Sequence, residues 1–408
     1  MSANTIELPS PEYHLGDFFQ WSLPKEKLPE TLTPIGLELF PRIHWKNREQ
    51  SEGEWHWGHL AGFTFDEKMD LLEKAPHTIL FHWQNFFDRE GTGEWSKFFD
   101  HSLPILPQIS LFPDKLVLRH VGKRLDRWPC GPWPSSPLFA SSVPSLPSVL
   151  EEKLNPSYDG WKSKWSLLAK EFETQSLDKV VLSRKKIRSF RAPLDTRSLW
   201  KSKEFFQKDN YHISIEADAQ TSFHSFTPEC LFKLEGRLCQ TEALAGSMGR
   251  GRKDDDLLKN LKELEEHEIV IEGIVEDMEH LSEGHHFGDI QVIQLGYIQH
   301  LKTPLSFTLK ENVSPLDLCR ILHPTPALGG RPKKKALEFI QNHGGFDPGL
   351  YGAPIGRLEK DVQEYAVGIR SALLTENEMH IFAGAGITAT SNADSEWRET
   401  EEKMRPFS

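Results

Sequence analysis

The sequence predicts an α+β protein, because segments with strand-like and helix-like patterns come in clusters and do not alternate one by one. Residues 1 to about 127 combine many Trp, Phe, His and Pro residues with short runs typical of strands broken by turns. Residues 211–247 again suggest several short strands with Gly at the turns. Amphipathic stretches later in the chain indicate helices, and we find no repeat of fixed period.

The second half of the chain contains the clearest individual elements. Apolar residues at helical spacing predict helices at 160–172, 254–282, 333–343 and 394–407. The 254–282 helix opens with three consecutive aspartates, whose charge suits a helix N-terminus. Apolar and alternating runs predict strands at 179–187, 364–374 and 379–389.

The composition favours a cytoplasmic protein that does not act on nucleic acid. The 408 residues carry a formal net charge of -12, whereas phosphate backbones are held by clustered Lys and Arg. The four cysteines (130, 230, 239 and 319) lack CxxC spacing, which suits reduced thiols better than disulfides or zinc. We find neither a signal-like N-terminus nor a run of ~18 apolar residues, so no membrane partner is expected.

Residues 128–148 are dominated by Pro and Ser and are predicted to be a connector. It marks either a lobe boundary or a long surface crossing within one large domain. The chain is therefore divided into an N-terminal half, 1–148, and a second half, 149–408.

Two charged helix segments contain carboxylates spaced by three residues. In "KELEEHEIV" (262–270), Glu263 and Glu266 lie on one helix face, and Glu396 and Glu399 repeat this spacing near the C-terminus. Oxygen-only ligands of this kind suit Mg²⁺. A solvated acidic face explains the same pattern, and spacing alone favours that interpretation.

Several other residues allow a functional and a structural interpretation. Lys179 opens a strand and could act as a base in a desolvated pocket, although most such lysines are solvated. Glu229, after Pro228, could be a general acid or a simple turn carboxylate. Arg370 in an apolar strand pairs either with an internal acid or with a substrate carboxylate.

Glycines close to these residues could present backbone N–H groups to an anion. Gly246 lies in "LAGS", and Gly384 and Gly386 lie in "AGAGIT". A lone GxG is weak evidence, and we find no GxGxxG or GxxxxGK[ST] motif.

Eight motifs together resemble the chorismate-utilising enzymes, in the order of that family, between Lys179 and Lys403. They are "KVVLSR", "TPECLFKLEGRLCQTEALAGS", "KELEEHEIV", "LHPTPALGGRPKKKAL", "YGAPIG", "GIRSAL", "FAGAGI" and "EWRETEEK". The resemblance implies two antiparallel sheets packed together with helices on the outside, in a single large domain.

The resemblance also implies site residues, matched position by position. Lys179 would be the base that activates water and Glu229 the acid that protonates the leaving hydroxyl. Glu266 and Glu399 would bind Mg²⁺ directly, and Glu263 and Glu396 would hold metal-bound waters. The residues expected to receive the two substrate carboxylates are Gly246, Tyr351, Arg370, Gly384 and Lys403.

One position and two stretches favour the isochorismate synthases within this family. Ala245 stands where aminodeoxychorismate synthases carry a lysine nucleophile, and "HPTPALGG" (323–330) resembles the isochorismate synthase run. The stretch 39–63 resembles the opening of menaquinone-type members. Ser247 departs from the pattern, since many members have Thr there.

The resemblance therefore implies Mg²⁺-dependent conversion of chorismate to isochorismate, towards menaquinone. A base and an acid working on one ring need opposite protonation states, so we expect a lowered pKa for Lys179 and a raised pKa for Glu229. Alternatives are a salicylate synthase, a siderophore-pathway isochorismate synthase, and a non-catalytic chorismate-binding paralogue. Water as nucleophile requires no amidotransferase subunit, and the chain is expected to be a monomer or a homodimer.

Overall fold

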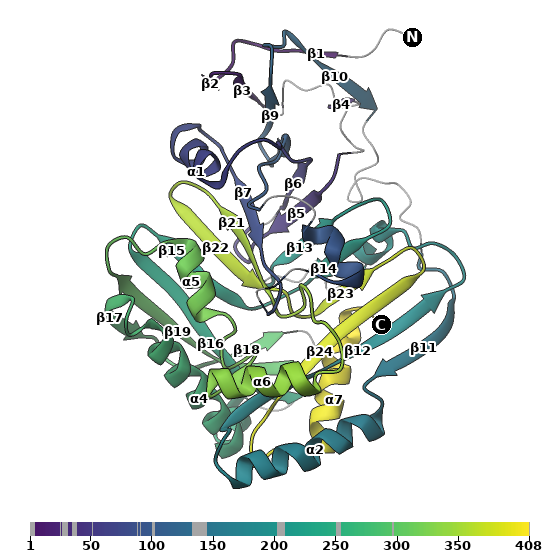
Figure 1. The fold of residues 1–408 in the computed structure, drawn as a ribbon, viewed down its shortest axis with the longest axis vertical. Coiled ribbons are helices and arrows are strands. Elements are labelled where there is room, and N and C mark those ends of the chain that lie inside the picture. The colour runs from purple at the N-terminus through teal and green to yellow at the C-terminus, as the bar shows by residue number, and fades with distance from the viewer. Residues whose placement is uncertain are drawn as a thin grey trace.

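Two large antiparallel sheets, with helices around them, form most of the protein (Figure 1). The computed structural model describes residues 5–24, 26, 32–34, 39–50, 52–87, 89, 91–99, 103–132, 145–201, 209–249, 254–295 and 298–407. This architecture confirms the expected α+β class and the two packed sheets.

The first sheet has 13 strands among the described residues, in the order β11-β12-β24-β23-β14-β13-β5-β6-β8-β9-β3-β2, with β20 also paired to β12. Strands from both halves of the chain meet where β5 pairs with β13. The strands are β2 (Tyr13–Leu15), β3 (Phe18–Pro24), β5 (Arg42–Lys46), β6 (Glu54–Trp57), β8 (Ile109–Leu111), β9 (Lys115–Val121), β11 (Val149–Asn155), β12 (Lys179–Phe190), β13 (His212–Glu216), β14 (Ser222–Ser225), β20 (Gly330–Arg331), β23 (Ser371–Leu374) and β24 (Glu378–Ile387).

The second sheet has 8 strands in the described part of the chain, in the order β17-β19-β16-β15-β22-β21-β7, with β18 paired to β19. The N-terminal half contributes its edge strand β7, which pairs with β21. The strands are β7 (Leu80–Trp83), β15 (Cys230–Glu235), β16 (Leu238–Gly249), β17 (Ser282–Phe287), β18 (Gln291–Leu295), β19 (Ile298–Leu309), β21 (Pro354–Leu358) and β22 (Val362–Val367).

A shared apolar core holds the two sheets face to face. Ile213, Phe223 and Phe382 of the first sheet are buried in one cluster with Phe81 and Trp83 of the second. Alternation along each strand sends these side chains inward.

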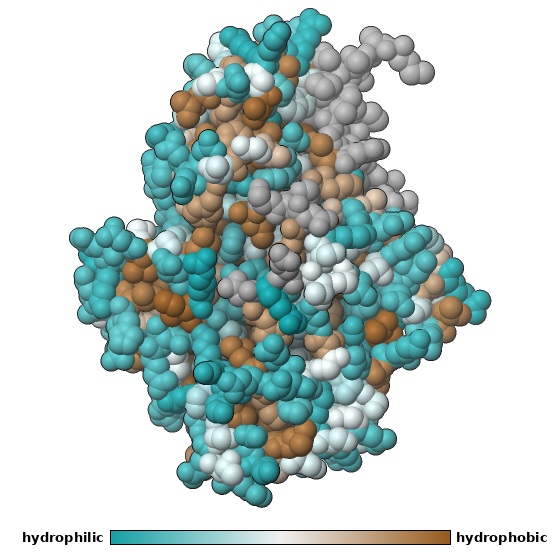
Figure 2. Space-filling model, in the orientation of Figure 1, coloured by the Kyte–Doolittle hydropathy of each residue, from teal (hydrophilic) through white to brown (hydrophobic). Residues whose placement is uncertain are grey.

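Helices cover the outer faces of both sheets. The long helix α4 buries Val270, Ile274 and Met278 against the second sheet, and α5 packs beside it. Helices α2, α6 and α7 cover β12 and β24 of the first sheet. In the view of Figure 2 the surface over these helices is largely hydrophilic with scattered hydrophobic patches, as expected of helices that bury one side. The α-helices are α1 (Phe65–Lys74), α2 (Tyr158–Glu173), α3 (Asp254–Leu258), α4 (Leu261–Met278), α5 (Pro315–Leu322), α6 (Lys333–His343) and α7 (Ala393–Met404), and the 3₁₀ helices are η2 (Gly93–Phe99), η3 (Thr196–Lys201) and η5 (Arg405–Phe407).

The structure corrects two predicted elements. The single helix expected at 254–282 is two helices, because Asn260 leaves the helix and caps α4 by accepting from the Glu263 N–H. The strand expected at 364–374 is also two, β22 and β23, which belong to different sheets. Arg370 lies between them with φ of 46°, so the backbone turns there instead of continuing as a strand.

A small three-stranded sheet lies beside the N-terminal strands and consists of β1 (Thr5–Glu7), β10 (Arg127–Pro132) and β4 (Leu32–Pro34). The start of the predicted connector is therefore strand β10, and residues 133–144 lie outside the described residues. Cys230, Cys239 and Cys319 are buried, and none of these three is part of a disulfide. No helix in the described ranges is long and apolar enough to span a membrane.

Candidate active site

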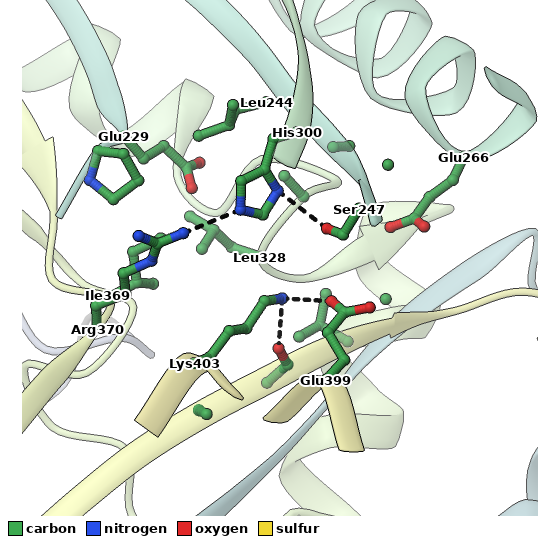
Figure 3. Close-up of a pocket in the computed structure, with 18 of the residues that line it drawn as sticks. Glu229, Leu244, Ser247, Glu266, His300, Leu328, Ile369, Arg370, Glu399 and Lys403 are labelled. Carbon is green, nitrogen blue, oxygen red and sulfur yellow. Dashed lines mark hydrogen bonds and ion pairs between the residues drawn. The ribbon is translucent and has the colours of Figure 1, made fainter. Parts of the chain in front are cut away.

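One cavity brings together side chains from β12, β16, β19, β24, α4 and α7. All the catalytic and substrate-binding residues expected from the resemblance line it, and Glu266 and Glu399 line it too. Figure 3 shows Glu229, His300 and Arg370 on one side and Glu266 and Glu399 on the other. Its lining includes Lys179, Glu229, Leu244, Ala245, Gly246, Ser247, Glu266, His300, Leu328, Tyr351, Ile369, Arg370, Phe382, Gly384, Gly386, Glu399 and Lys403.

Lys179 is almost completely buried and bonded to a carboxylate. Its side chain is 1% exposed, and its Nζ atom lies 2.9 Å from Oε1 of Glu266. Burial alone would raise the pKa of Glu266, but the Lys179 ammonium group holds this pKa below its ordinary value. A Cβ atom on Gly386 would lie 2.7 Å from Lys179 Cε, so this glycine leaves room for the pair.

Glu229 is a buried carboxyl group at the entry to β15. Its N–H donates to Thr227 Oγ1 at 3.1 Å, and its carbonyl oxygen accepts from the Val367 N–H at 3.1 Å. Burial, and then the nearby Glu242 carboxylate, raise the pKa of Glu229 to about 8. This group therefore holds its proton at neutral pH, as a general acid must.

Arg370 is oriented by a histidine that belongs to β19. Arg370 Nη2 donates to His300 Nε2 at 2.9 Å. Because an arginine cannot accept, His300 must carry its proton on Nδ1, which donates to Ser247 Oγ at 2.9 Å. Burial and then the Arg370 charge lower the pKa of His300, which keeps the imidazole neutral.

Lys403 and Tyr351 line the cavity and both lie next to Gly384. Lys403 Nζ lies 2.7 Å from Glu399 Oε1 and donates to the Gly384 carbonyl at 2.9 Å. A Cβ atom on Gly384 would lie 2.7 Å from the Tyr351 hydroxyl oxygen. Gly384 thus leaves space for the Tyr351 hydroxyl and accepts a hydrogen bond from Lys403 through its carbonyl oxygen. Tyr351 stacks on Phe382, with ring centroids 5.3 Å apart.

Gly246 has a conformation that other residues rarely adopt. Its φ is 76°, and a Cβ atom there would lie 2.7 Å from the Glu263 carbonyl oxygen. The glycine therefore lets β16 pass close to helix α4. The next N–H, of Ser247, donates to Glu263 Oε2 at 2.6 Å.

The four predicted metal-binding glutamates converge from two helices. Glu263 and Glu266 come from α4, and Glu396 and Glu399 come from α7. Burial, and then the charge of Glu399, raise the pKa of Glu396 to about 7. Burial likewise raises the pKa of Glu263, to which the charges of Glu266 and Glu399 add.

Lysine side chains form ion pairs with these acids. Lys262 Nζ lies 2.9 Å from Glu396 Oε1 and 3.2 Å from Glu263 Oε1. No cluster of three or more metal-ligating side chains is already in place among the described residues. The oxygen-only donors and their mutual repulsion nevertheless fit a hard divalent cation such as Mg²⁺, which would replace the lysine contacts.

The remaining residues of the acidic motif divide between surface and core. Glu265 and Glu268 are exposed and carry surface charge. His267 is buried, with Nδ1 3.1 Å from the Ala245 carbonyl oxygen and Nε2 2.8 Å from Thr303 Oγ1. It ties α4 to β16 and β19.

Sequence reasoning missed His300, Leu244, Leu328, Ile369 and Phe382 as lining residues. For His300 the only local signal is its place in a strand, because its contacts with Arg370 and Ser247 join residues far apart in the chain. For Ser247 the sequence indicates only a departure from the family pattern.

The sequence profile of the chorismate binding enzymes matches residues 138–408. The chain belongs to this family. Among chorismate binding enzymes, it is similar to isochorismate synthase MenF of Bacillus subtilis, which is 29% identical over 97% of this chain and 88% of its own length. It is also similar to the salicylate biosynthesis isochorismate synthase of Pseudomonas aeruginosa, 34% identical over 59% of this chain and 52% of that protein.

A solved structure of a chorismate binding enzyme has the same fold. MenF, the menaquinone-specific isochorismate synthase from Escherichia coli, superimposes with a TM-score of 0.78 at 21% identity, over 98% of this chain and 95% of that chain. The fold expected from the resemblance is thereby confirmed.

Proposed function

We propose that this protein converts chorismate to isochorismate. The observation that carries the proposal is the cavity itself, in which the buried amine of Lys179 and the proton-holding carboxyl group of Glu229 face a common space. Ala245 lines the same cavity, so the covalent lysine of the aminodeoxychorismate synthases has no counterpart at that position.

Lys179 and Glu229 divide the proton transfers between them. Lys179, acting in its neutral amine form, takes a proton from water, whose oxygen forms a bond to C2 while the ring double bonds shift. The C4–O bond breaks, and Glu229 gives its proton to the departing hydroxyl, which leaves as water. The pKa of about 8 keeps Glu229 protonated near neutral pH, which supports its role as the acid.

The substrate is a dianion, and the basic side chains of the cavity explain how an acidic protein would hold it. Arg370, oriented by His300, offers its guanidinium group to one carboxylate, and Lys403 and Tyr351 offer further donors. Gly246 and Gly384 allow close approach of the backbone. Positioning of this kind is a large part of what an enzyme supplies.

Mg²⁺ is the proposed cofactor. Glu266 and Glu399 would bind it directly, and Glu263 and Glu396 would hold its waters. Bound there, the ion would neutralise a substrate carboxylate and would compete with Lys179 for Glu266, which would weaken the contact between these two side chains.

The decisive experiment is incubation of the purified protein with chorismate and Mg²⁺, followed by chromatography and mass spectrometry of the product. We expect isochorismate, and we expect Lys179→Ala to lose roughly 100-fold or more of turnover at saturating substrate. Full turnover by Lys179→Ala would rule out the mechanism. Salicylate with pyruvate would identify a salicylate synthase instead, and no loss of chorismate would identify a non-catalytic paralogue. Water as nucleophile gives no reason to expect an amidotransferase partner.

Menaquinone synthesis is the pathway we propose. The match to a MenF-type relative over 97% of the chain supports it, whereas the match to the salicylate biosynthesis relative covers 59%. Deletion of the gene in its own organism should abolish menaquinone. Loss of a catechol siderophore or of salicylate, with menaquinone unchanged, would contradict this assignment.

A further inference from the structure

Glu229 is flanked in the chain by two backbone groups that bind one ion pair. Arg48, from the turn after β5, donates through Nη1 to the Pro228 carbonyl oxygen at 3.0 Å and to Glu242 Oε1 at 2.7 Å. The same Oε1 atom accepts from the Cys230 N–H at 3.2 Å. The residues immediately before and after Glu229 are thus both fixed by the Arg48–Glu242 pair.

This ion pair is built into the protein and lies behind the active site. The Glu242 side chain is 5% exposed, and Lys302 of β19 binds its second oxygen at 2.7 Å. Arg48 also lies over the Tyr211 ring. Arg48, Cys230, Glu242 and Lys302 border a second cavity of about 280 Å³, whereas Glu229 faces the first.

We propose that the Arg48–Glu242 pair positions the general acid, by fixing the turn that carries Glu229 and by setting the charge behind its carboxyl group. This inference rests on the proposed function, since that function makes Glu229 the acid. The N-terminal half of the chain would then take part in positioning Glu229, because Arg48 belongs to that half.

The charges around Glu229 act in opposite directions. After burial, Glu242 is the largest cause that raises the pKa of Glu229, while Lys179, Lys403 and Arg48 lower it. The Tyr351 hydroxyl also lies near Glu229, whose charge contributes to raising the pKa of Tyr351. Removing the charge of Glu242 and removing that of Arg48 should therefore move the titration of Glu229 in opposite directions.

The test compares Glu242→Gln with Arg48→Gln, both of which keep a polar side chain of similar length. In Glu242→Gln the alkaline limb of the kcat–pH profile should move to lower pH by about one unit. In Arg48→Gln it should move to higher pH, and kcat should fall because the Pro228 carbonyl loses its charged donor. A merely structural role would not give shifts of opposite sign.

Glu364→Gln is the matched control. Glu364 borders the same second cavity and accepts from the Tyr211 hydroxyl at 2.7 Å and from the Asn47 amide at 3.3 Å, and neither partner belongs to the turn that carries Glu229. The alkaline limb of the kcat–pH profile of Glu364→Gln should lie at the same pH as in the unaltered protein. If one of the two test variants does not fold, the direction in which the alkaline limb moves in the other variant still tests the inference.

The carboxyl stretch of protonated Glu229, measured as an infrared difference against Glu229→Gln, gives its pKa without turnover. An unchanged Glu229 pKa in both test variants, or shifts of the same sign, would overturn the inference. If the unaltered protein makes no isochorismate, the proposed function fails, whereas the infrared titration still shows whether the ion pair controls Glu229.

Discussion

At the scale of single residues, the buried proton of Glu229 links activity to stability. The pKa is raised from an ordinary 4.5 to about 8, so between these pH values the folded state holds a proton that the unfolded state releases. The stability contribution is fully present below about pH 4.5 and is lost as the pH rises through about 8. The loss is up to about 1.4 kcal/mol per pH unit.

Glu229→Gln should therefore be inactive but more stable than the unaltered protein at high pH. A neutral amide of the same shape removes the cost of keeping the carboxyl group protonated. Thermal melts from pH 5 to pH 9 should show a Tm advantage for the variant that grows up to about pH 8 and then levels off. A Tm difference independent of pH would show that the pKa of Glu229 is not raised.

Arg370 should contribute mainly to substrate binding. Loss of a charge-assisted hydrogen bond to a carboxylate in Arg370→Ala is expected to raise KM for chorismate roughly tenfold or more. Steady-state kinetics would measure it, with kcat less affected if the contact is equal in ground and transition states.

Arg398→Ala is a suitable control, because Arg398 is an exposed residue of α7 that does not line the cavity. An unchanged KM in Arg370→Ala would remove Arg370 from the substrate-binding residues.

At the scale of elements, helices α4 and α7 create the acidic half of the site. Each carries two glutamates at a spacing of three, and the pKa values of Glu263 and Glu396 respond to acids of the opposite helix. Glu266→Gln and Glu399→Gln should each weaken Mg²⁺ binding by roughly tenfold or more. Calorimetric titration with Mg²⁺ in the absence of chorismate measures this without turnover.

Glu265→Gln changes an exposed carboxylate of the same helix and should leave Mg²⁺ affinity unaltered. Unchanged affinity in Glu266→Gln and Glu399→Gln would mean that the acids serve only as partners of Lys179 and Lys403, with which they are paired here.

At the scale of the whole molecule, the two halves of the chain share both large sheets. The pairing of β5 with β13 and of β7 with β21 crosses the proposed boundary at 148. Trp45, Phe81 and Trp83 of the first half complete the core between the sheets. We therefore propose that the halves are parts of one folding unit.

A truncated chain of residues 149–408 should not fold by itself, because it would expose two strand edges and the face of this core. Far-UV circular dichroism during heating would show one transition for the whole chain and no cooperative transition for the truncated one. A cooperative melt of the truncated chain would contradict the proposal.

The sequence by itself determined whatever depends on local spacing or on ordered motifs. Glu263 with Glu266, and Glu396 with Glu399, share a helix face because the helical period is local. The motifs also predicted Lys179, Glu229 and Lys403 as site residues, and the structure brings all three to one cavity.

Only the tertiary structure decided which elements meet. The run 364–374 is mostly apolar, and such a pattern does not say that the chain changes sheet at Arg370. His300 and the Arg48–Glu242 pair reach the site through contacts between residues that are 53 to 194 positions apart. Periodicity reports how a segment faces its surroundings, whereas these partners are fixed by the packing of two sheets and two helices around one core.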